Sequence, residues 1–210
     1  GRAGDTAAAG TVLRVRIDGA ITAVAADYAE RAVREAGRPG VAALLVELDT
    51  PGGDTASLSR IATAMLNSSV PVVVWVGPAG ARAASAGTFV VLAGHAAGMA
   101  ERTTIGAASP VDASGEDLPS TMQRKAIEDL AASARSLGGR RSAEAAAWAE
   151  SAVRDAAAAT AQEALDLGVI DVVADDPTAL LEALDGREVT VLGEATTLRT
   201  AGADVLDLPM

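Results

Sequence analysis

Between residues 11 and 76 the chain alternates between short apolar runs and helix-like segments, and this alternation constrains the fold more than any other feature. The run 41–48 is almost continuously apolar, which is typical of a strand buried on both faces of a sheet. Strands are predicted at 11–17, 41–48 and 70–76, with helices over 23–36 and after Asp54. Strands and helices that alternate in this way form right-handed βαβ units, so the sequence predicts an α/β fold with a mainly parallel sheet.

The remaining sequence is richer in predicted helices than in strands. We expect a small-residue helix from about residue 84 to 97, irregular structure over 99–109 and a polar loop over 111–120. The later elements are predicted as helices over about 119–137, 142–154, 160–167 and 177–184, a strand over 169–173, and a terminal hairpin of 188–191 with 196–200. We expect a flexible tail over 1–10, one folded domain over 11–185 and a C-terminal hairpin extension of that domain over 186–210.

The charge balance and the rare residue types exclude several classes of function. A formal net charge of -11 argues against nucleic acid or an anionic membrane surface as a partner, because both require a basic face. No apolar stretch is long enough to span a bilayer. The chain has no cysteine and a single histidine, so neither a disulfide nor a metal site is expected, and no cofactor is implied.

The basic residues are strongly biased: 16 of the 17 are arginines, and Lys125 is the single lysine. A chain with this bias is expected to use arginine for an ordinary solvated charge. Lysine can lose its proton when it is desolvated, whereas arginine effectively cannot. Lys125 is therefore a candidate for a site that needs a neutral amine, although chance retention would leave the same pattern.

Ser85 lies among small residues at the predicted start of a helix. Such a serine has room for a substrate beside it, and the N–H of Ala86 faces the same space. The same pattern also fits a serine packed at a close helix contact. As nucleophile Ser85 needs a base, and His95 would lie roughly 15 Å away along the predicted helix. His95 is then a packing residue, and Lys125 remains as the base.

A Pro-Gly-Gly turn follows the second predicted strand at residues 51–53. Glycines let the backbone approach a ligand closely, and a free N–H in such a turn can donate to a developing oxyanion. An ordinary turn has the same sequence, so the motif is weak alone. Asp49, which ends the strand, is either catalytic or, more simply, a structural carboxylate that accepts backbone N–H groups of the loop.

Several motifs together resemble the NfeD (nodulation efficiency D) family of membrane-associated serine proteases, within the Clp-peptidase/crotonase superfamily. The resemblance rests on the segments 18–21, 48–53, 80–88, 106–111, 163–165 and 168–171, together with His95, Met99 and Lys125. It implies a Clp/crotonase-like α/β fold of repeated β-β-α and βαβ units, with a mainly parallel sheet and packed helices. It also implies a catalytic dyad of Ser85 and Lys125 and an oxyanion hole formed by the N–H groups of Gly53 and Ala86. Where Clp peptidases have a catalytic histidine this chain has Ser109-Pro110, which favours a dyad over a triad.

The resemblance further implies a substrate and a setting. The family cleaves apolar segments of membrane-associated proteins, notably the C-terminal region of stomatin-like proteins, and forms homodimers. Gly52, Asp54 and Thr55 are expected to contact the substrate, although the family usually has apolar residues where this chain has Asp54 and Thr55. We expect a full-length protein at a membrane with its protease domain outside the cytoplasm, anchoring segments that are absent from this chain, and a soluble domain here.

These observations predict a serine endopeptidase that works through an acyl-enzyme. Two alternatives stay open. One is a crotonase-type acyl-CoA enzyme, which would use the same kind of oxyanion hole but needs pocket carboxylates and a basic patch for the phosphates of coenzyme A. The other is a catalytically silent module that binds a peptide in the same groove.

Overall fold

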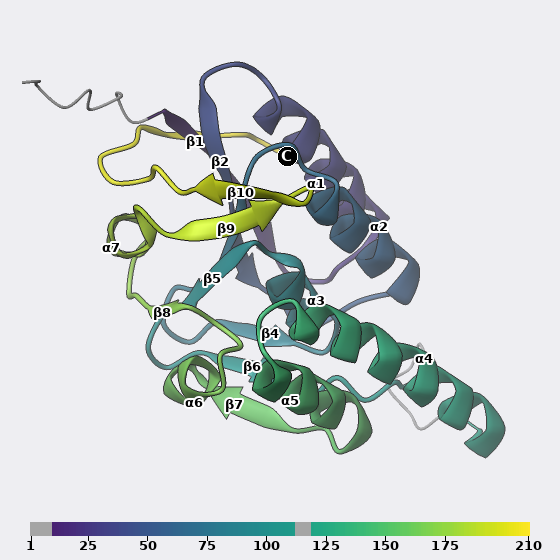
Figure 1. The fold of residues 1–210 in the computed structure, drawn as a ribbon. Helices are drawn as coiled ribbons and strands as arrows, with labels where there is room; N and C mark the ends of the chain where they lie inside the picture. The colour runs from purple at the N-terminus through teal and green to yellow at the C-terminus, as the bar shows by residue number, and fades with distance from the viewer. Residues whose placement is uncertain (1–9, 112–118) are drawn as a thin grey trace, which may run out of the picture.

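The computed structural model describes residues 10–111 and 119–210, and its centre is a six-stranded parallel sheet (Figure 1). The strands lie in the order β11-β1-β2-β3-β5-β8, and every neighbouring pair is parallel. Their bounds are β1 (Thr11–Asp18), β2 (Val41–Asp49), β3 (Val72–Val76), β5 (Ala96–Met99), β8 (Val172–Val173) and β11 (Val205–Asp207). The predicted α/β class and parallel sheet are confirmed.

Helices and two smaller sheets surround the central sheet. The helices are α1 (Ala23–Ala36), α2 (Thr55–Leu66), α3 (Ala86–Ala93), α4 (Ser120–Gly139), α5 (Ala143–Arg154), α6 (Ala161–Asp166) and α7 (Pro177–Leu184). One small sheet consists of β4 (Arg82–Ala84), β6 (Thr104–Gly106) and β7 (Ala158–Thr160), in that order. The other is the predicted terminal hairpin, made of β9 (Glu188–Val191) and β10 (Glu194–Thr197).

The central sheet is buried on both faces. Successive residues of its strands point to opposite sides, so β1, β2, β3 and β5 each contribute side chains to two separate apolar clusters. In β2, Leu44 and Val46 belong to the core cluster that the larger group of helices covers, whereas Ala43 and Leu45 belong to a second cluster with α7. In Figure 1 α1 and α2 lie on one side of the sheet, and α7 and the β9–β10 hairpin lie on the other. Each fully buried leucine of this kind stabilises the fold by about 1.5–3 kcal/mol.

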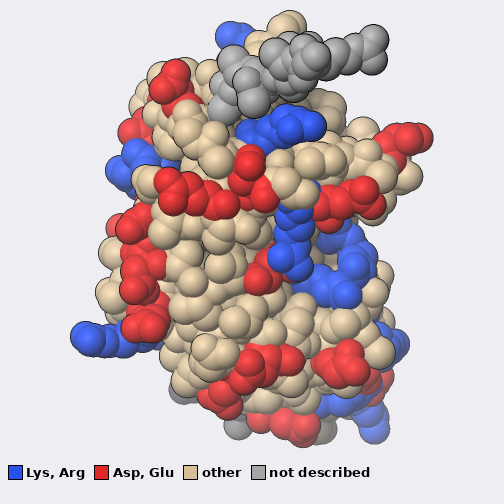
Figure 2. Space-filling view, turned by 60° about the vertical axis from the view of Figure 1, so that its left-hand side comes forward, with Lys and Arg blue, Asp and Glu red and all other residues tan. Residues whose placement is uncertain are grey.

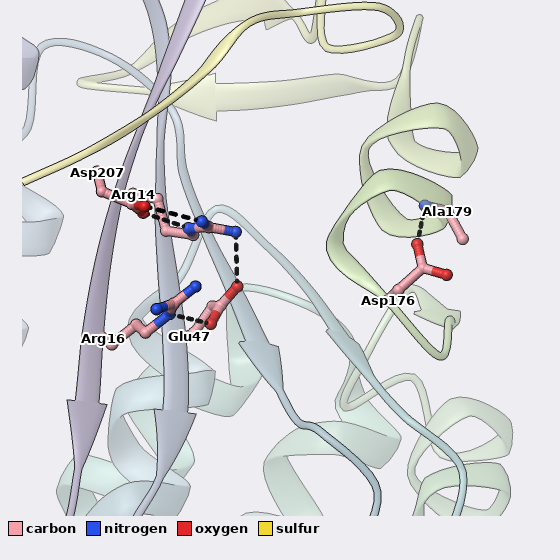
Figure 3. A network of polar contacts seen from close by, with 6 residues as sticks. All are labelled: Arg14, Arg16, Glu47, Asp176, Ala179 and Asp207. Carbon is pink, nitrogen blue, oxygen red and sulfur yellow. Dashed lines mark hydrogen bonds and ion pairs between the residues drawn. The ribbon is translucent and has the colours of Figure 1, made fainter.

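Side chains cap the starts of several helices. The hydroxyl of Thr22 accepts the N–H of Ala25 at α1, and the carboxylate of Asp176 accepts the N–H of Ala179 at α7 (Figure 3). At α6 both hydrogen bonds of a capping box between Thr160 and Glu163 are present. These caps satisfy backbone donors that have no partner within the helix itself.

Other predictions about secondary structure were wrong. The helix expected to reach residue 97 ends at Ala93, because Gly94 takes an extended conformation and β5 begins at Ala96. The region 99–109, expected to be irregular, contains β6, and the strand expected over 169–173 is limited to β8. Most of the predicted loop over 111–120 lies outside the described residues.

Strand β11 was not predicted, and a charged network joins it to the sheet (Figure 3). Arg14 in β1 donates from Nε and Nη2 to the two carboxylate oxygens of Asp207 at 2.6 and 3.0 Å. Arg14 Nη1 also donates to Glu47 in β2 at 3.3 Å, and Arg16 Nε donates to the same carboxylate at 2.9 Å. The network thus crosses three adjacent strands and fixes the edge strand in place.

Candidate active site

Ser85 lies at the junction between β4 and α3, in a backbone conformation that serine rarely adopts. Its φ is 53° and its ψ is -119°, and α3 begins at the next residue. Its N–H donates to the carbonyl of Gly106 at 2.9 Å, and its own carbonyl accepts the N–H of Thr88 at 3.0 Å. A positive φ at a non-glycine residue costs on the order of 1–3 kcal/mol and marks candidate functional positions. The half-buried side chain is thus held at a sharp strand-to-helix turn, as nucleophiles often are.

The small sheet holds this turn in place. The hydroxyl of Thr88, one turn into α3, contacts the carbonyls of Ala83 at 3.1 Å and Gly106 at 3.2 Å. Gly106 is the last residue of β6, and its carbonyl accepts both the N–H of Ser85 and the hydroxyl of Thr88. Neither β4 nor β6 was predicted from the sequence, so this support for the strained serine was not foreseen.

The Pro-Gly-Gly turn is organised by the buried side chain of Thr50. The Thr50 Oγ1 accepts the N–H of Gly52 at 3.1 Å and donates to the carbonyl of the same residue at 3.2 Å. The turn also pairs with Ile21, whose N–H donates to Gly52 O and whose carbonyl accepts the N–H of Asp54. Because neighbours of Gly53 make this parallel bridge, the N–H of Gly53 itself points away from Ile21.

The glycine turn lies directly against Ser85. A Cβ built on Gly52, whose φ is +121°, would lie 2.8 Å from Ser85 Cβ and 3.2 Å from Ser85 Oγ. In the described part of the chain, no acceptor takes the N–H of Gly53 or that of Ala86, the first residue of α3. The structure therefore brings together the hydroxyl of Ser85, the turn and two backbone donors without acceptors, as an oxyanion hole requires.

Lys125 is not joined to this cluster. It lies in the second turn of α4, and its side chain is exposed. Figure 1 shows the first turns of α4 extending past the other described elements. No hydrogen bond among the described residues links Lys125 to Ser85.

His95 and Asp49 have structural roles. His95 lies just beyond α3, at the end opposite Ser85; its Nδ1 accepts the N–H of Val72 at 2.9 Å, and its own N–H donates to Val72 O at 2.8 Å. Burial, with the nearby charges of Arg140 and Arg141, lowers its pKa to about 4. His95 is thus a packing residue as predicted, although it lies after the helix rather than within it. The carboxylate of Asp49 accepts the N–H of Arg82 at 3.1 Å.

Asp54 and Thr55 begin α2 immediately after the glycine turn. The Asp54 carboxylate caps the helix by accepting the N–H of Ser57 at 2.7 Å and its hydroxyl at 2.8 Å, and these hydrogen bonds lower the pKa of Asp54. The contact of both residues with substrate remains a prediction. Thr55 also lines a groove between α2, α3 and α4.

A mainly apolar groove of about 580 Å³ runs between α2, α3 and α4. Its apolar lining includes Leu58 on α2, Phe89 on α3 and Leu130 on α4. Ser85 does not line the groove itself, but Phe89 lies one helical turn from Ser85, and Thr55 follows the glycine turn by two residues. An apolar side chain of an extended ligand could be buried there.

No group of three or more metal-ligating side chains occurs within residues 10–111 and 119–210. In the same residues, no helix has both the length and the apolar character to cross a bilayer.

The parallel sheet, the small sheet and the serine turn together are the α/β architecture of the Clp-peptidase/crotonase class. The chain belongs to the NfeD family: residues 11–192 match the family described as NfeD1b, N-terminal domain. It is 33% identical over 197 residues to the membrane-bound protease PH1510 of Pyrococcus horikoshii. The match covers 90% of this chain and 44% of that protein, so the chain spans less than half the length of this relative.

Solved structures of the protease called 1510-N are similar along almost the whole chain. A lysine-to-alanine variant of this stomatin-specific protease, in complex with a substrate peptide, is 33% identical with a TM-score of 0.85, covering 97% of this chain and 94% of its own. A serine-to-alanine variant is 33% identical with a TM-score of 0.86, covering 97% and 99%. The Pyrococcus horikoshii protease specific for a stomatin homolog is 32% identical with a TM-score of 0.77, covering 95% and 92%.

Proposed function

We propose that this chain is a serine endopeptidase in which Ser85 is the nucleophile. The observation that carries the proposal is the strained conformation of Ser85 against the Gly52–Gly53 turn, with two backbone N–H groups free of acceptors beside it. A strained turn of this kind has an energetic cost, and the hydrogen bonds of Ser85 and Thr88 to the small sheet hold it in place.

The proposed reaction passes through an acyl-enzyme. The Oγ of Ser85 attacks the scissile carbonyl while Lys125, as a neutral amine, accepts the hydroxyl proton. The N–H groups of Gly53 and Ala86 donate to the oxyanion of the tetrahedral intermediate. Lys125 then gives its proton to the leaving amine as the C–N bond breaks, and water hydrolyses the resulting ester by the same steps in reverse order.

The assignment of Lys125 requires its amine to come within about 2.6–3.2 Å of the Ser85 hydroxyl in the substrate complex. Its place at the exposed start of α4 means that this approach has to occur when substrate binds. Two facts support the assignment: Lys125 is the single lysine of the chain, and the solved relatives include one serine and one lysine variant. The half-buried His95 has no free Nδ1 with which to act as base.

The proposed substrate is an apolar segment of a membrane-associated protein, specifically the C-terminal region of a stomatin-like protein. The groove between α2 and α4 supports this choice, because Leu58, Phe89 and Leu130 line it and Phe89 is one helical turn from Ser85. The relative 1510-N is named as stomatin-specific. We further infer an extracytoplasmic homodimer, and the exposed side chains of Val111 and Met122 near the start of α4 support a contact with a second copy.

The test is hydrolysis of apolar peptides from a stomatin-like C-terminus by four variants. Ser85→Ala and Lys125→Arg should each lose at least about 10³-fold in kcat/KM. Their matched controls, Ser69→Ala on an exposed loop and Arg124→Lys beside Lys125, should keep the wild-type value. Wild-type activity in Ser85→Ala would overturn the nucleophile, and wild-type activity in Lys125→Arg would overturn the base alone.

A further inference from the structure

A second cavity, of about 850 Å³, lies at the end of α3 opposite Ser85. The C-terminal ends of α3 and α4, the segment from α6 to β8, and β9 surround it. Its charged lining residues are Arg140, Arg141, Asp171, Arg187 and Glu188. Figure 2 shows a hollow with basic side chains at its rim, on a face where acidic side chains are otherwise widespread.

Asp171 is the carboxylate at the centre of this cluster, and its oxygens are already occupied. Its Oδ2 accepts from Arg141 Nη1 at 3.1 Å and from the N–H of Ala97 at 2.9 Å. Its Oδ1 pairs with Arg187 Nη2 at 3.2 Å. The side chains of Arg141 and Asp171 are only 8% and 15% exposed. One largely enclosed carboxylate therefore pairs with two guanidinium groups.

Arg140 has no carboxylate partner among the described residues. Its Nη1 donates to the carbonyls of Leu92 and Ala93 at the end of α3, at 3.2 and 3.3 Å. Its other two nitrogens donate to no group in that part of the chain. Burial and the charge of Arg141 lower the pKa of Arg140, as expected where positive charges crowd together.

Other N–H donors at the cavity are also unpaired, and the exposed Glu188 is the one lining carboxylate without a partner among the described residues. The Nε of Arg141 is buried and has no acceptor within the described chain. His95 also lines the cavity, and because its Nδ1 accepts the N–H of Val72, the neutral ring carries its proton on Nε2. The lining thus carries three guanidinium groups against two carboxylates, and one of these carboxylates already pairs with Arg141 and Arg187, so positive charge and unpaired N–H groups are in excess.

We propose that this cavity binds a small molecule that carries a phosphate-type oxyanion, held by Arg140 and Arg187. Guanidinium groups bind such oxyanions through paired, charge-assisted hydrogen bonds. The volume is much larger than one phosphate group, so the ligand has further atoms that contact the neighbouring wall of β9. Of the two sources of this chemistry, a free phosphate compound fits better than a lipid headgroup, because the chain carries a net charge of -11.

The test is titration of the whole chain with pyrophosphate at pH 7, followed by isothermal calorimetry and by Tm, with sodium chloride of equal ionic strength as the salt control. Pyrophosphate should bind at one site and raise Tm above the salt control. Arg140→Gln and Arg187→Gln should each weaken binding at least tenfold, and the double variant should abolish it. Arg199→Gln, an exposed arginine outside the cavity, should bind as the wild type does.

Arg187→Gln keeps the proposal testable if Arg140→Gln fails to fold, because the Arg187 side chain is 48% exposed and does not hold the end of α3. Flotation with phosphatidylglycerol vesicles distinguishes the two sources. If the wild type floats with the vesicles and the double variant does not, the ligand is a lipid headgroup, and the proposal of a free phosphate compound is contradicted. Equal binding of pyrophosphate by the wild type and the double variant, or no binding above the salt control, would overturn the site.

Discussion

Replacing Gly52 with alanine should affect both the position of Ser85, which is measured by kcat/KM, and the stability of the fold, which is measured by the free energy of unfolding. The new Cβ would lie 2.8 Å from Ser85 Cβ, where ordinary contacts begin at 3.4 Å, so one of the two residues must move by roughly half an ångström. A misplacement of about 1 Å can lower a rate by about 10²-fold, so kcat/KM should fall by about ten- to a hundredfold. The φ of +121° adds a loss of about 1–3 kcal/mol in the free energy of unfolding.

The matched control is Gly40→Ala. Gly40 also has a positive φ, +87°, but a Cβ there meets nothing within 4 Å. Urea denaturation should therefore show a similar loss of stability in both variants, whereas peptide hydrolysis at full substrate saturation should fall in Gly52→Ala alone. Wild-type kcat in Gly52→Ala, or an equal fall in Gly40→Ala, would refute the reasoning that the glycine turn positions Ser85.

Two further predictions concern the buried Thr50 and the half-buried His95. Thr50→Val should lower kcat about ten- to a hundredfold with little change in KM, because two hydrogen bonds that hold the turn of Gly52 are lost. Thr50→Ser, which keeps the hydroxyl, should retain most of the activity. A change in KM alone would contradict the role of Thr50 in positioning the turn. His95 has a pKa near 6.5 in the unfolded chain and about 4 in the folded one, so the unfolded state binds more protons between these two values. The free energy of unfolding should therefore fall, by up to about 2 kcal/mol, as pH drops from 6.5 to 4. His95→Asn should flatten that slope in urea midpoints measured from pH 7 to pH 4, and an unchanged slope would contradict the assignment.

The features that the sequence predicted are those coded by local patterns. The strand β2 and the helix that follows Asp54 could be predicted because each depends on residues within a few positions along the chain. The candidate nucleophile Ser85 and the glycine turn were identified for the same reason, since small residues at a strand end leave room for a ligand.

The missed features depend on contacts between distant segments. Strands β4, β6 and β7 have three residues each and are rich in alanine, threonine and glycine, so no apolar period marks them. Strand β11 exists through its pairing with β1 and the contact of Asp207 with Arg14, nearly two hundred positions earlier. For the same reason the role of Thr50 was not visible, because an isolated threonine before proline carries no sign that its hydroxyl will be buried.

Covalent labelling tests the central claim most directly. A peptidyl fluorophosphonate reacts with an activated serine, and intact mass followed by peptide mapping identifies the modified residue. The account predicts one adduct per chain, on Ser85, formed quickly in the wild type, slowly in Lys125→Arg and not at all in Ser85→Ala. An adduct on another serine, or labelling of Lys125→Arg at the wild-type rate, would contradict it.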